Sequence, residues 1–348
     1  GYCYGGFLLE VTENIADAAE IGEITADGKI SYNGEEIGLE RLLGIYENKL
    51  ESVYRCNKQN PKTEMLTFSY TAENRVSPAV KTAKPKVLIP VFPGTNCEYD
   101  SAKAMRDAGA EPEIFVINNR SAENVAKSVE DFANSLKTAQ MVFIPGGFSG
   151  GDEPDGSGKF ITAFFRNAAV KEQVTDLLDN RDGLMCGICN GFQALIKLGL
   201  VPYGRIIDTD ENCPTLTYNT IARHQSKIVR TRIASNKSPW LADTEVGDIY
   251  SVPISHGEGR FIASDELIHR LAENGQIATQ YVDEKGEATS DIHFNPNGSY
   301  YAIEGITSPD GRVFGKMGHS ERYAADLYKN VPGNYDIKMF RSAVKYFK

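Results

Sequence analysis

Between residues 86 and 198 the sequence alternates apolar runs with helix-like segments, and this alternation constrains the fold more than any other feature. The apolar runs predict strands buried on both faces, at 87–92, 113–117, 141–144 and 183–188. The segments after them predict helices at 97–108, 121–136, 160–178 and 191–198. Such alternation is typical of an α/β fold with a mostly parallel sheet flanked by helices, which binds ligands at the carboxyl ends of its strands. Shorter strand-like runs between about 215 and 318 predict antiparallel additions to the sheet.

Charge and hydropathy argue against two kinds of partner. The chain of 348 residues has 37 Lys and Arg against 47 Asp and Glu, a net charge of −10, and a sequence pI near 5.2. This acidic balance argues against general nucleic-acid binding. No apolar run approaches the roughly 18 residues of a membrane span. We therefore expect neither a nucleic-acid nor a membrane partner.

The cysteines favour one functional thiol over a metal or redox pair. Their only close pair is Cys186-Gly187-Ile188-Cys189. Zinc needs a second pair of ligands at similar spacing, which none of the five histidines supplies. A redox pair begins a helix with both sulfurs exposed, whereas Cys186 stands in an apolar run. Of this pair, Cys189 alone is therefore considered as a functional thiol.

Residues 1–85 lack the strand–helix alternation. An apolar strand at 6–11, an Ala-rich helical stretch, a hairpin around 29–32 and a helix from about 38 to 54 predict a small α+β piece over 1–57. Residues 58–85 are polar and contain three prolines, which predicts a linker. The chain opens Gly-Tyr-Cys without an initiator Met or a signal-peptide pattern, so we expect it to be part of a longer protein.

The segment 187–193, Gly-Ile-Cys-Asn-Gly-Phe-Gln, follows a predicted buried strand and opens a helix. This is the pattern of a nucleophile elbow with Cys189 as the nucleophile, and its glycines permit a tight turn. The helix N-terminus favours thiolate over thiol. The N–H of Asn190 is expected to point toward the oxyanion that forms during attack. The alternative is a buried cysteine in a glycine-rich turn.

A second oxyanion donor is expected from a neighbouring strand end. Residues 145–151, Pro-Gly-Gly-Phe-Ser-Gly-Gly, supply glycines that can turn N–H groups into the same pocket. The rival interpretation is a phosphate-binding loop. The run lacks the Gly-Lys-Ser/Thr ending of a P-loop, which argues against that interpretation.

A thiol nucleophile needs a base and a group that orients the base. His319-Ser320-Glu321 offers both, because residues i and i+2 of an extended segment project to the same side. His256-Gly257-Glu258 has the same pattern. Residue pattern alone does not choose between the two.

Six segments, in this order, resemble the class I, triad-type glutamine amidotransferases, and most closely the glutaminase domains of phosphoribosylformylglycinamidine synthases of purine biosynthesis. They are FPGTNC at 92–97, PGGFS at 145–149, CNGFQ at 189–193, HGEGRF at 256–261, NPNGS at 295–299 and GHSER at 318–322. The resemblance covers about 85–325 and implies a flavodoxin-like α/β glutaminase domain over 86–348. Residues 5–37 resemble the C-terminal end of the family's synthetase half, so 1–57 is expected to be a remnant of that AIR-synthase-like domain.

The resemblance implies a Cys189–His319–Glu321 triad, with the His256 segment structural or interfacial. It places Gln193 where related enzymes contact the amino-acid end of glutamine. It also implies backbone oxyanion donors on Asn190 and on the adjacent loop residues Gly147 and Phe148. The implied reaction is hydrolysis of glutamine to glutamate and ammonia through a glutamyl thioester.

The resemblance further implies a cytoplasmic enzyme that passes ammonia to a synthetase half, which uses ATP and magnesium to convert formylglycinamide ribonucleotide to the amidine. We expect no cofactor and no metal in this chain. The chain departs from the family at Ser320, where Pro is usual, and after Phe148, where Ser-Tyr-Gly-Asp is common. Two alternatives are a catalytically silent glutaminase-like assembly or regulatory module, and a Cys-elbow hydrolase that acts on another substrate. The complete triad argues against the first, and Gln193 together with the synthetase-like start argues against the second.

Overall fold

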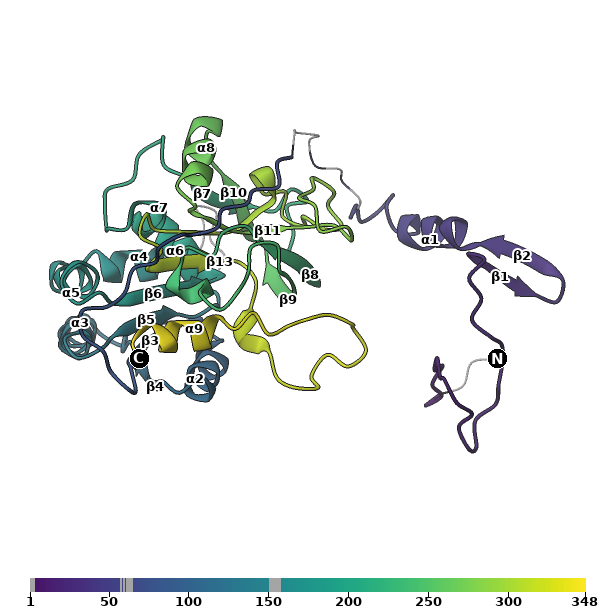
Figure 1. Ribbon diagram of the computed structural model, residues 1–348, viewed down its shortest axis with the longest axis horizontal. Coiled ribbons are helices and arrows are strands. Elements are labelled where there is room, and N and C mark those ends of the chain that lie inside the picture. The colour runs from purple at the N-terminus through teal and green to yellow at the C-terminus, as the bar shows by residue number, and fades with distance from the viewer. Residues whose placement is uncertain (1–3, 57, 59, 61–64, 150–157) are drawn as a thin grey trace. The chain divides into compact units, whose positions relative to one another are not determined.

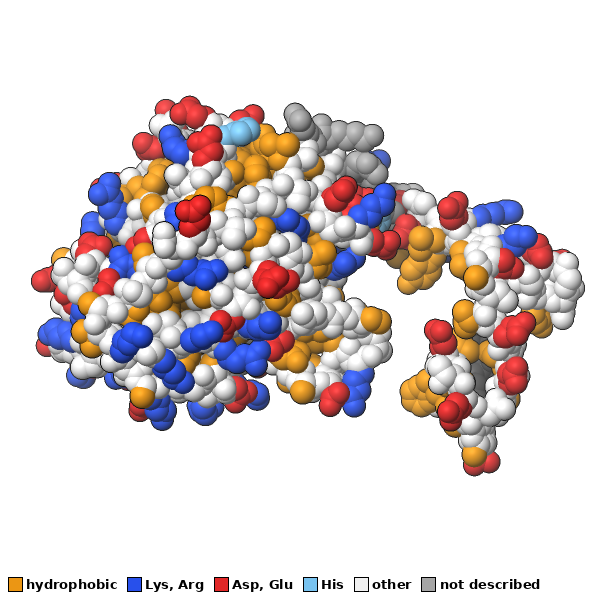
Figure 2. All heavy atoms as spheres, in the orientation of Figure 1, with side chains coloured by type: hydrophobic (Ala, Val, Ile, Leu, Met, Phe, Trp, Pro, Cys, Tyr) orange, Lys and Arg blue, Asp and Glu red, His pale blue; other side chains and the backbone are white. Residues whose placement is uncertain are grey.

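The computed structural model describes residues 4–56, 58, 60, 65–149 and 158–348. By its internal contacts the chain divides into two units, 1–57 and 58–348 (Figure 1). Within the described ranges, none of the helices combines the length and apolar character that a membrane crossing needs. Figure 2 shows acidic and basic side chains interspersed over the larger unit.

The first unit contains the predicted hairpin and one helix. Strands β1 (Lys29–Tyr32) and β2 (Glu35–Gly38) pair antiparallel across an Asn-Gly turn, and α1 (Leu39–Asn48) follows. Both turn residues, Asn33 and Gly34, have positive φ, as a two-residue hairpin turn requires. Residues 6–11 are described and form no strand, because no neighbouring strand pairs with them. No residue of α1 is buried.

The second unit is built on a nine-stranded mixed sheet of order β4-β3-β5-β6-β13-β12-β11-β8-β9. One half is parallel and consists of β4 (Glu111–Val116), β3 (Lys86–Val91), β5 (Met141–Ile144), β6 (Leu184–Ile188) and β13 (Val313–Lys316). The other half is antiparallel and consists of β12 (Ile303–Thr307), β11 (Ile277–Tyr281), β8 (Gln225–Ile233) and β9 (Ile249–His256). The α/β fold and the antiparallel extension are thus confirmed.

Helices cover the parallel half in two groups. The first group, packed side by side, is α3 (Ala122–Leu136), α4 (Lys159–Phe165), α5 (Ala168–Asp179) and α6 (Asn190–Leu198). In the second group α2 (Glu98–Asp107) contacts α9 (Met339–Tyr346). The single helix expected over 160–178 is two helices, because Asn167 leaves the helical conformation and its side chain caps α5 by accepting the N–H of Ala169.

Further elements lie beside the antiparallel half. They are α7 (Leu200–Tyr203), α8 (Asp265–Glu273), and a two-stranded sheet of β7 (Thr215–Tyr218) with β10 (Glu258–Ile262). The segment expected to be a linker, 58–85, belongs to this unit. Phe68 donates its N–H to the side chain of Gln280 at 2.8 Å, and Tyr70 donates its N–H to Ala234 O at 2.8 Å. These bonds hold the segment against β8 and β11.

Candidate active site

The turn between β6 and α6 carries Cys189 at the carboxyl end of a central parallel strand. Cys189 is 5% exposed and has φ 53°, ψ −106°. A side chain on Gly191 would place its Cβ 2.1 Å from Ile144 O, and one on Gly187 would lie 2.6 Å from Gly191 O. Both glycines are therefore required for helix α6 to approach the sheet this closely. The cysteine N–H donates to Lys316 O at 2.9 Å, and its thiol donates to Ser255 O at 3.7 Å.

His319 and Glu321 lie in the loop after β13, the strand next to β6. His319 Nδ1 stands 2.6 Å from Glu321 Oε1, and both side chains are almost wholly buried. Because a carboxylate only accepts hydrogen bonds, Nδ1 carries the proton of this contact. Nε2 is buried without a hydrogen-bond partner among the described residues. It is therefore available to a thiol or a substrate.

The pKa shifts of His319 and Glu321 follow the neighbouring groups rather than burial. Burial alone would lower the pKa of His319, but the Glu321 carboxylate and the thiols of Cys189 and Cys97 raise it well above its usual value. Burial alone would raise the pKa of Glu321, but the charge and hydrogen bond of His319 lower it. The contact thus raises the pKa of the histidine and lowers the pKa of the carboxylate, which favours the charged form of each group.

The competing His256 has a different environment. Burial lowers its pKa to about 3, and the charges of His319 and His224 add to that effect. Its Nδ1 lies 3.1 Å from Asn219 Oδ1 and therefore donates to an amide rather than to a carboxylate. A histidine with so low a pKa is a weak proton acceptor and therefore a poor general base. These observations favour His319 over His256 as the base.

The loop after β5 approaches the turn after β3. Gly147 bridges to Thr95, and the N–H of Phe148 donates to Gly94 O at 2.8 Å. Gly147 has φ 148°, and a Cβ there would lie 2.6 Å from Gly94 O. Phe148, expected with Gly147 to be an oxyanion donor, therefore uses its N–H in a hydrogen bond within the protein. The N–H of Gly147 has no carbonyl partner among the described residues.

Asn190 and Gln193 belong to one buried network. Asn190 Oδ1 accepts the hydroxyl of Ser149 at 2.6 Å, and its amide donates to Gln193 Oε1 at 2.9 Å. The Gln193 amide in turn donates to Glu258 O at 2.8 Å. Gln193, expected to contact glutamine, thus ties the loop after β5 and strand β10 to the start of α6. Residues 150–157, where the chain departs from the family pattern, lie outside the described residues.

Comparison with known proteins decides the family. A family model for the CobB/CobQ-like glutamine amidotransferase domain matches residues 84–347. The chain belongs to this family. The phosphoribosylformylglycinamidine synthase subunit PurQ of Methanococcus maripaludis strain S2 is 36% identical over 255 residues, which is 73% of this chain and 87% of that protein.

Two further comparisons agree with this result. The PurQ subunit of Aquifex aeolicus is 32% identical over 250 residues, 71% of this chain and 95% of that protein. The structure of PurLQS from Thermotoga maritima has a matched chain that is 26% identical, with 76% of this chain and 100% of that chain covered and a TM-score of 0.55. The expected glutamine amidotransferase membership is therefore confirmed.

The amidotransferase site contains two residues that the sequence patterns did not single out as functional. Cys97 is fully buried at the start of α2, with its Sγ 3.8 Å from His319 Nδ1. Arg322 Nη2 donates to the same sulfur at 3.0 Å. The position of Cys97 after a central parallel strand was the available signal, since site residues gather at such strand ends.

Cys97, His319 and Glu321 also lie close enough to bind a metal ion, with ligand atoms within 4.8 Å of one another. The Arg322 guanidinium beside Cys97 opposes a cation there, and Glu321 already accepts from His319. That no metal binds this chain stays a prediction.

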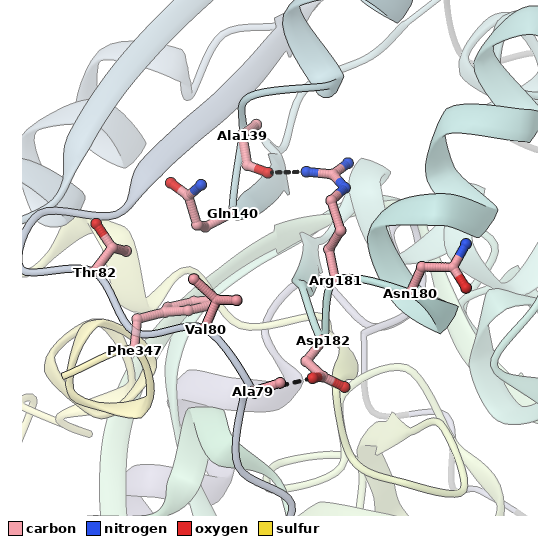
Figure 3. A pocket seen from close by; sticks show the side chains of 9 residues that line it. All are labelled: Ala79, Val80, Thr82, Ala139, Gln140, Asn180, Arg181, Asp182 and Phe347. Atoms are coloured by element: carbon pink, nitrogen blue, oxygen red, sulfur yellow. Dashed lines mark hydrogen bonds between the residues drawn. The ribbon is translucent and has the colours of Figure 1, made fainter.

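A cavity of about 190 Å³ lies away from this site (Figure 3). It is lined by residues that precede β5 and β6, such as Gln140 and Asp182, together with Val80 and Phe347. Gln140 and Asp182 stand at the amino ends of β5 and β6, whereas Cys189 stands at a carboxyl end. The Asp182 carboxylate accepts a hydrogen bond from the N–H of Ala79 and forms an ion pair with Arg312.

Proposed function

We propose that this chain hydrolyses glutamine to glutamate and ammonia with Cys189 as nucleophile, His319 as acid and base, and Glu321 as the group that orients His319. The observation that carries the proposal is the buried 2.6 Å contact between His319 Nδ1 and Glu321, which leaves Nε2 without a hydrogen-bond partner among the described residues. The elbow that holds Cys189 between β6 and α6 supports the proposal. Family membership supports glutamine as the substrate.

In the proposed reaction the Cys189 thiolate attacks the side-chain amide carbon of glutamine. The carbonyl oxygen becomes an oxyanion, which the N–H groups of Asn190 and Gly147 stabilise. The His319 imidazolium gives its Nε2 proton to the leaving nitrogen, and ammonia departs. Neutral His319 then takes a proton from water, which attacks the glutamyl thioester and releases glutamate.

We infer that the ammonia serves a synthetase partner in purine biosynthesis, in the conversion of formylglycinamide ribonucleotide to formylglycinamidine ribonucleotide. The names of the relatives support this: they are subunits of phosphoribosylformylglycinamidine synthase, and a matched structure is PurLQS. We expect ATP and magnesium to bind the synthetase and not this chain. A cytoplasmic location is proposed with this pathway, since the described cysteines are all free thiols.

We propose that residues 1–57 form part of a synthetase-type domain. Several large apolar side chains of this segment are more exposed to solvent than is usual for a protein surface. Phe7, for example, is 88% exposed and Leu8 is 80% exposed. The hairpin and α1 have no core of their own among the described residues, as expected of elements that pack on further parts of a larger domain.

The test is the variant Cys189→Ala in the complete enzyme. We expect glutamine-dependent synthesis to disappear and ammonia-dependent synthesis to stay, because only the nucleophile is lost. Cys213→Ala, at a half-buried free thiol, is the matched control and is expected to keep both activities. Glutamine use by Cys189→Ala would contradict the proposal, and a wild-type chain without any glutaminase activity beside its synthetase would favour a silent module.

A further inference from the structure

A buried lysine connects the nucleophile to the loop that carries the base. Lys316 is the last residue of β13, and none of its side chain is exposed. Because β13 pairs with β6 in parallel, Lys316 stands beside Ile188, and its carbonyl accepts the N–H of Cys189 at 2.9 Å. The backbone of Lys316 therefore helps to fix the position of Cys189.

The side chain of the same residue reaches the other half of the site. Lys316 Nζ donates to Gly318 O at 2.9 Å and to Ser320 Oγ at 3.0 Å. These two acceptors belong to the residues on either side of His319. One ammonium group thus holds the backbone before the histidine and the side chain after it.

The charge of the lysine is balanced by a second buried group. Glu304 Oε1 lies 3.3 Å from Lys316 Nζ and accepts the N–H of Gly318 at 2.6 Å. Its Oε2 accepts the hydroxyl of Thr279 at 2.5 Å. A Cβ on Gly318 would lie 2.7 Å from Val252 Cγ2 and 3.0 Å from Glu304 Oε1, so only glycine lets the carboxylate come so close.

A stability role alone does not account for this arrangement. Burying an ion pair usually stabilises a fold no more than apolar packing of the same volume does. Among the residues that the structure describes, the Lys316 ammonium contacts Glu304 and the residues on either side of His319 and no other polar group. A glycine in the loop gives its backbone extra freedom, which these bonds remove.

We propose that Lys316, with Glu304 and Ser320, is a positioning residue that holds the His319 ring at the distance from Cys189 that glutamine hydrolysis requires. The inference rests on the proposed function. Lys316 does not touch the substrate; it acts through Gly318 and Ser320. A misplacement of about 1 Å in a catalytic group lowers a rate by about 10²-fold, so loosening this loop affects the chemical step more than glutamine binding.

The first test compares Ser320→Ala with Ser320→Thr in the complete enzyme. Alanine removes one of the acceptors of the Lys316 ammonium without changing any charge, and threonine keeps a hydroxyl. We expect Ser320→Ala to lower kcat for glutamine about tenfold with KM within about twofold, and Ser320→Thr to recover most of the loss. The rate at which iodoacetamide alkylates Cys189, measured against pH, should change with Ser320→Ala, because the His319 ring no longer stands in one position.

The second test removes the ion pair. Lys316→Met alone leaves the Glu304 charge buried without a partner and is expected to fold poorly, so the double variant Lys316→Met/Glu304→Gln is used. It is expected to lose kcat by about tenfold or more while ammonia-dependent synthesis stays. Lys345→Met, which breaks the surface ion pair of Lys345 with Asp243, is the matched control and should keep the parental kcat.

An unchanged kcat in Ser320→Ala would overturn the inference, as would equal losses in the alanine and threonine variants, or losses that only follow a fall in Tm. If the double variant does not fold, the Ser320 pair decides alone. Cys189→Ala separates this inference from the proposed function. If that variant still uses glutamine, the function itself is wrong; if it does not and Ser320→Ala is unimpaired, only the positioning role is wrong.

Discussion

Gly146 lies so close to His319, the proposed base, that a single methyl group there tests the geometry of the site. A Cβ on Gly146 would stand 2.6 Å from His319 Cε1, 3.4 Å from His319 Nδ1 and 3.3 Å from Cys97 Sγ. The backbone of Gly146 is outside the left-handed region, so alanine meets no conformational penalty there. The change therefore acts through the histidine ring and its neighbour.

The size of the effect follows from the contact. Carbon atoms in non-bonded contact stand about 3.5–4.0 Å apart, so the ring must retreat by about 1 Å. The His319 ring cannot move away freely, because Glu321 holds its Nδ1 at 2.6 Å. The backbone of His319 is also fixed, since its backbone N–H donates to Pro253 O at 2.9 Å. A displacement of about 1 Å predicts a loss of about 10²-fold in kcat, or about 2.7 kcal/mol in the barrier. Overpacking of this kind costs about 1–3 kcal/mol of stability, which a domain of this size survives.

The assay is glutamate release by the complete enzyme, with ammonia-dependent synthesis and thermal unfolding measured on the same preparation. Gly44→Ala is the matched control, since nothing lies within 4 Å of a Cβ there. Gly146→Ala should lose glutaminase activity and keep ammonia-dependent synthesis. Glutaminase activity within about twofold of wild type would refute the placement of His319 against Gly146, because a 1 Å shift predicts far more.

Three further predictions concern the histidines. The Glu321 carboxylate raises the pKa of His319, so Glu321→Gln should move the alkaline limb of kcat/KM for glutamine to lower pH; a limb that does not move would contradict this. The contribution of the His319–Glu321 pair to the free energy of unfolding is lost as pH rises through the raised pKa of His319 and as pH falls through the lowered pKa of Glu321. The difference in unfolding free energy between wild type and Glu321→Gln, measured with urea, should therefore shrink at both pH extremes. His256→Ala should cost less glutaminase activity than His319→Ala in the same assay, and the reverse order would mean that His256 is the base.

Local patterns were sufficient for the parallel half of the sheet and for the elbow. Buried parallel strands are short apolar runs, and the tight turn at Cys189 needs glycines at fixed positions, so both leave a signature in neighbouring residues. The segment 58–85 leaves no such signature. Its contacts join Phe68 to Gln280 and Tyr70 to Ala234, more than 150 residues away, and a polar, proline-containing segment does not reveal them.

The finer geometry of the site depends on similar distant contacts. The N–H of Phe148 is directed by its bond to Gly94 O, which belongs to another strand end. Cys97 reaches His319 only because β3 and β13 bring their carboxyl ends to one side of the sheet. Lys316 reads in the sequence as an ordinary charged residue, and only the parallel register of β13 with β6 shows that it is buried beside Ile188.

The central claim is that glutamine is hydrolysed through a thioester on Cys189. Mass spectrometry of the complete enzyme, acid-quenched during turnover of glutamine and then digested, tests it directly. The account predicts a glutamyl adduct on the peptide that contains Cys189 and none on the peptide that contains Cys97. An adduct on Cys97 or on another residue, or steady glutamine consumption by an enzyme that carries no adduct in rapid-quench samples, would contradict it.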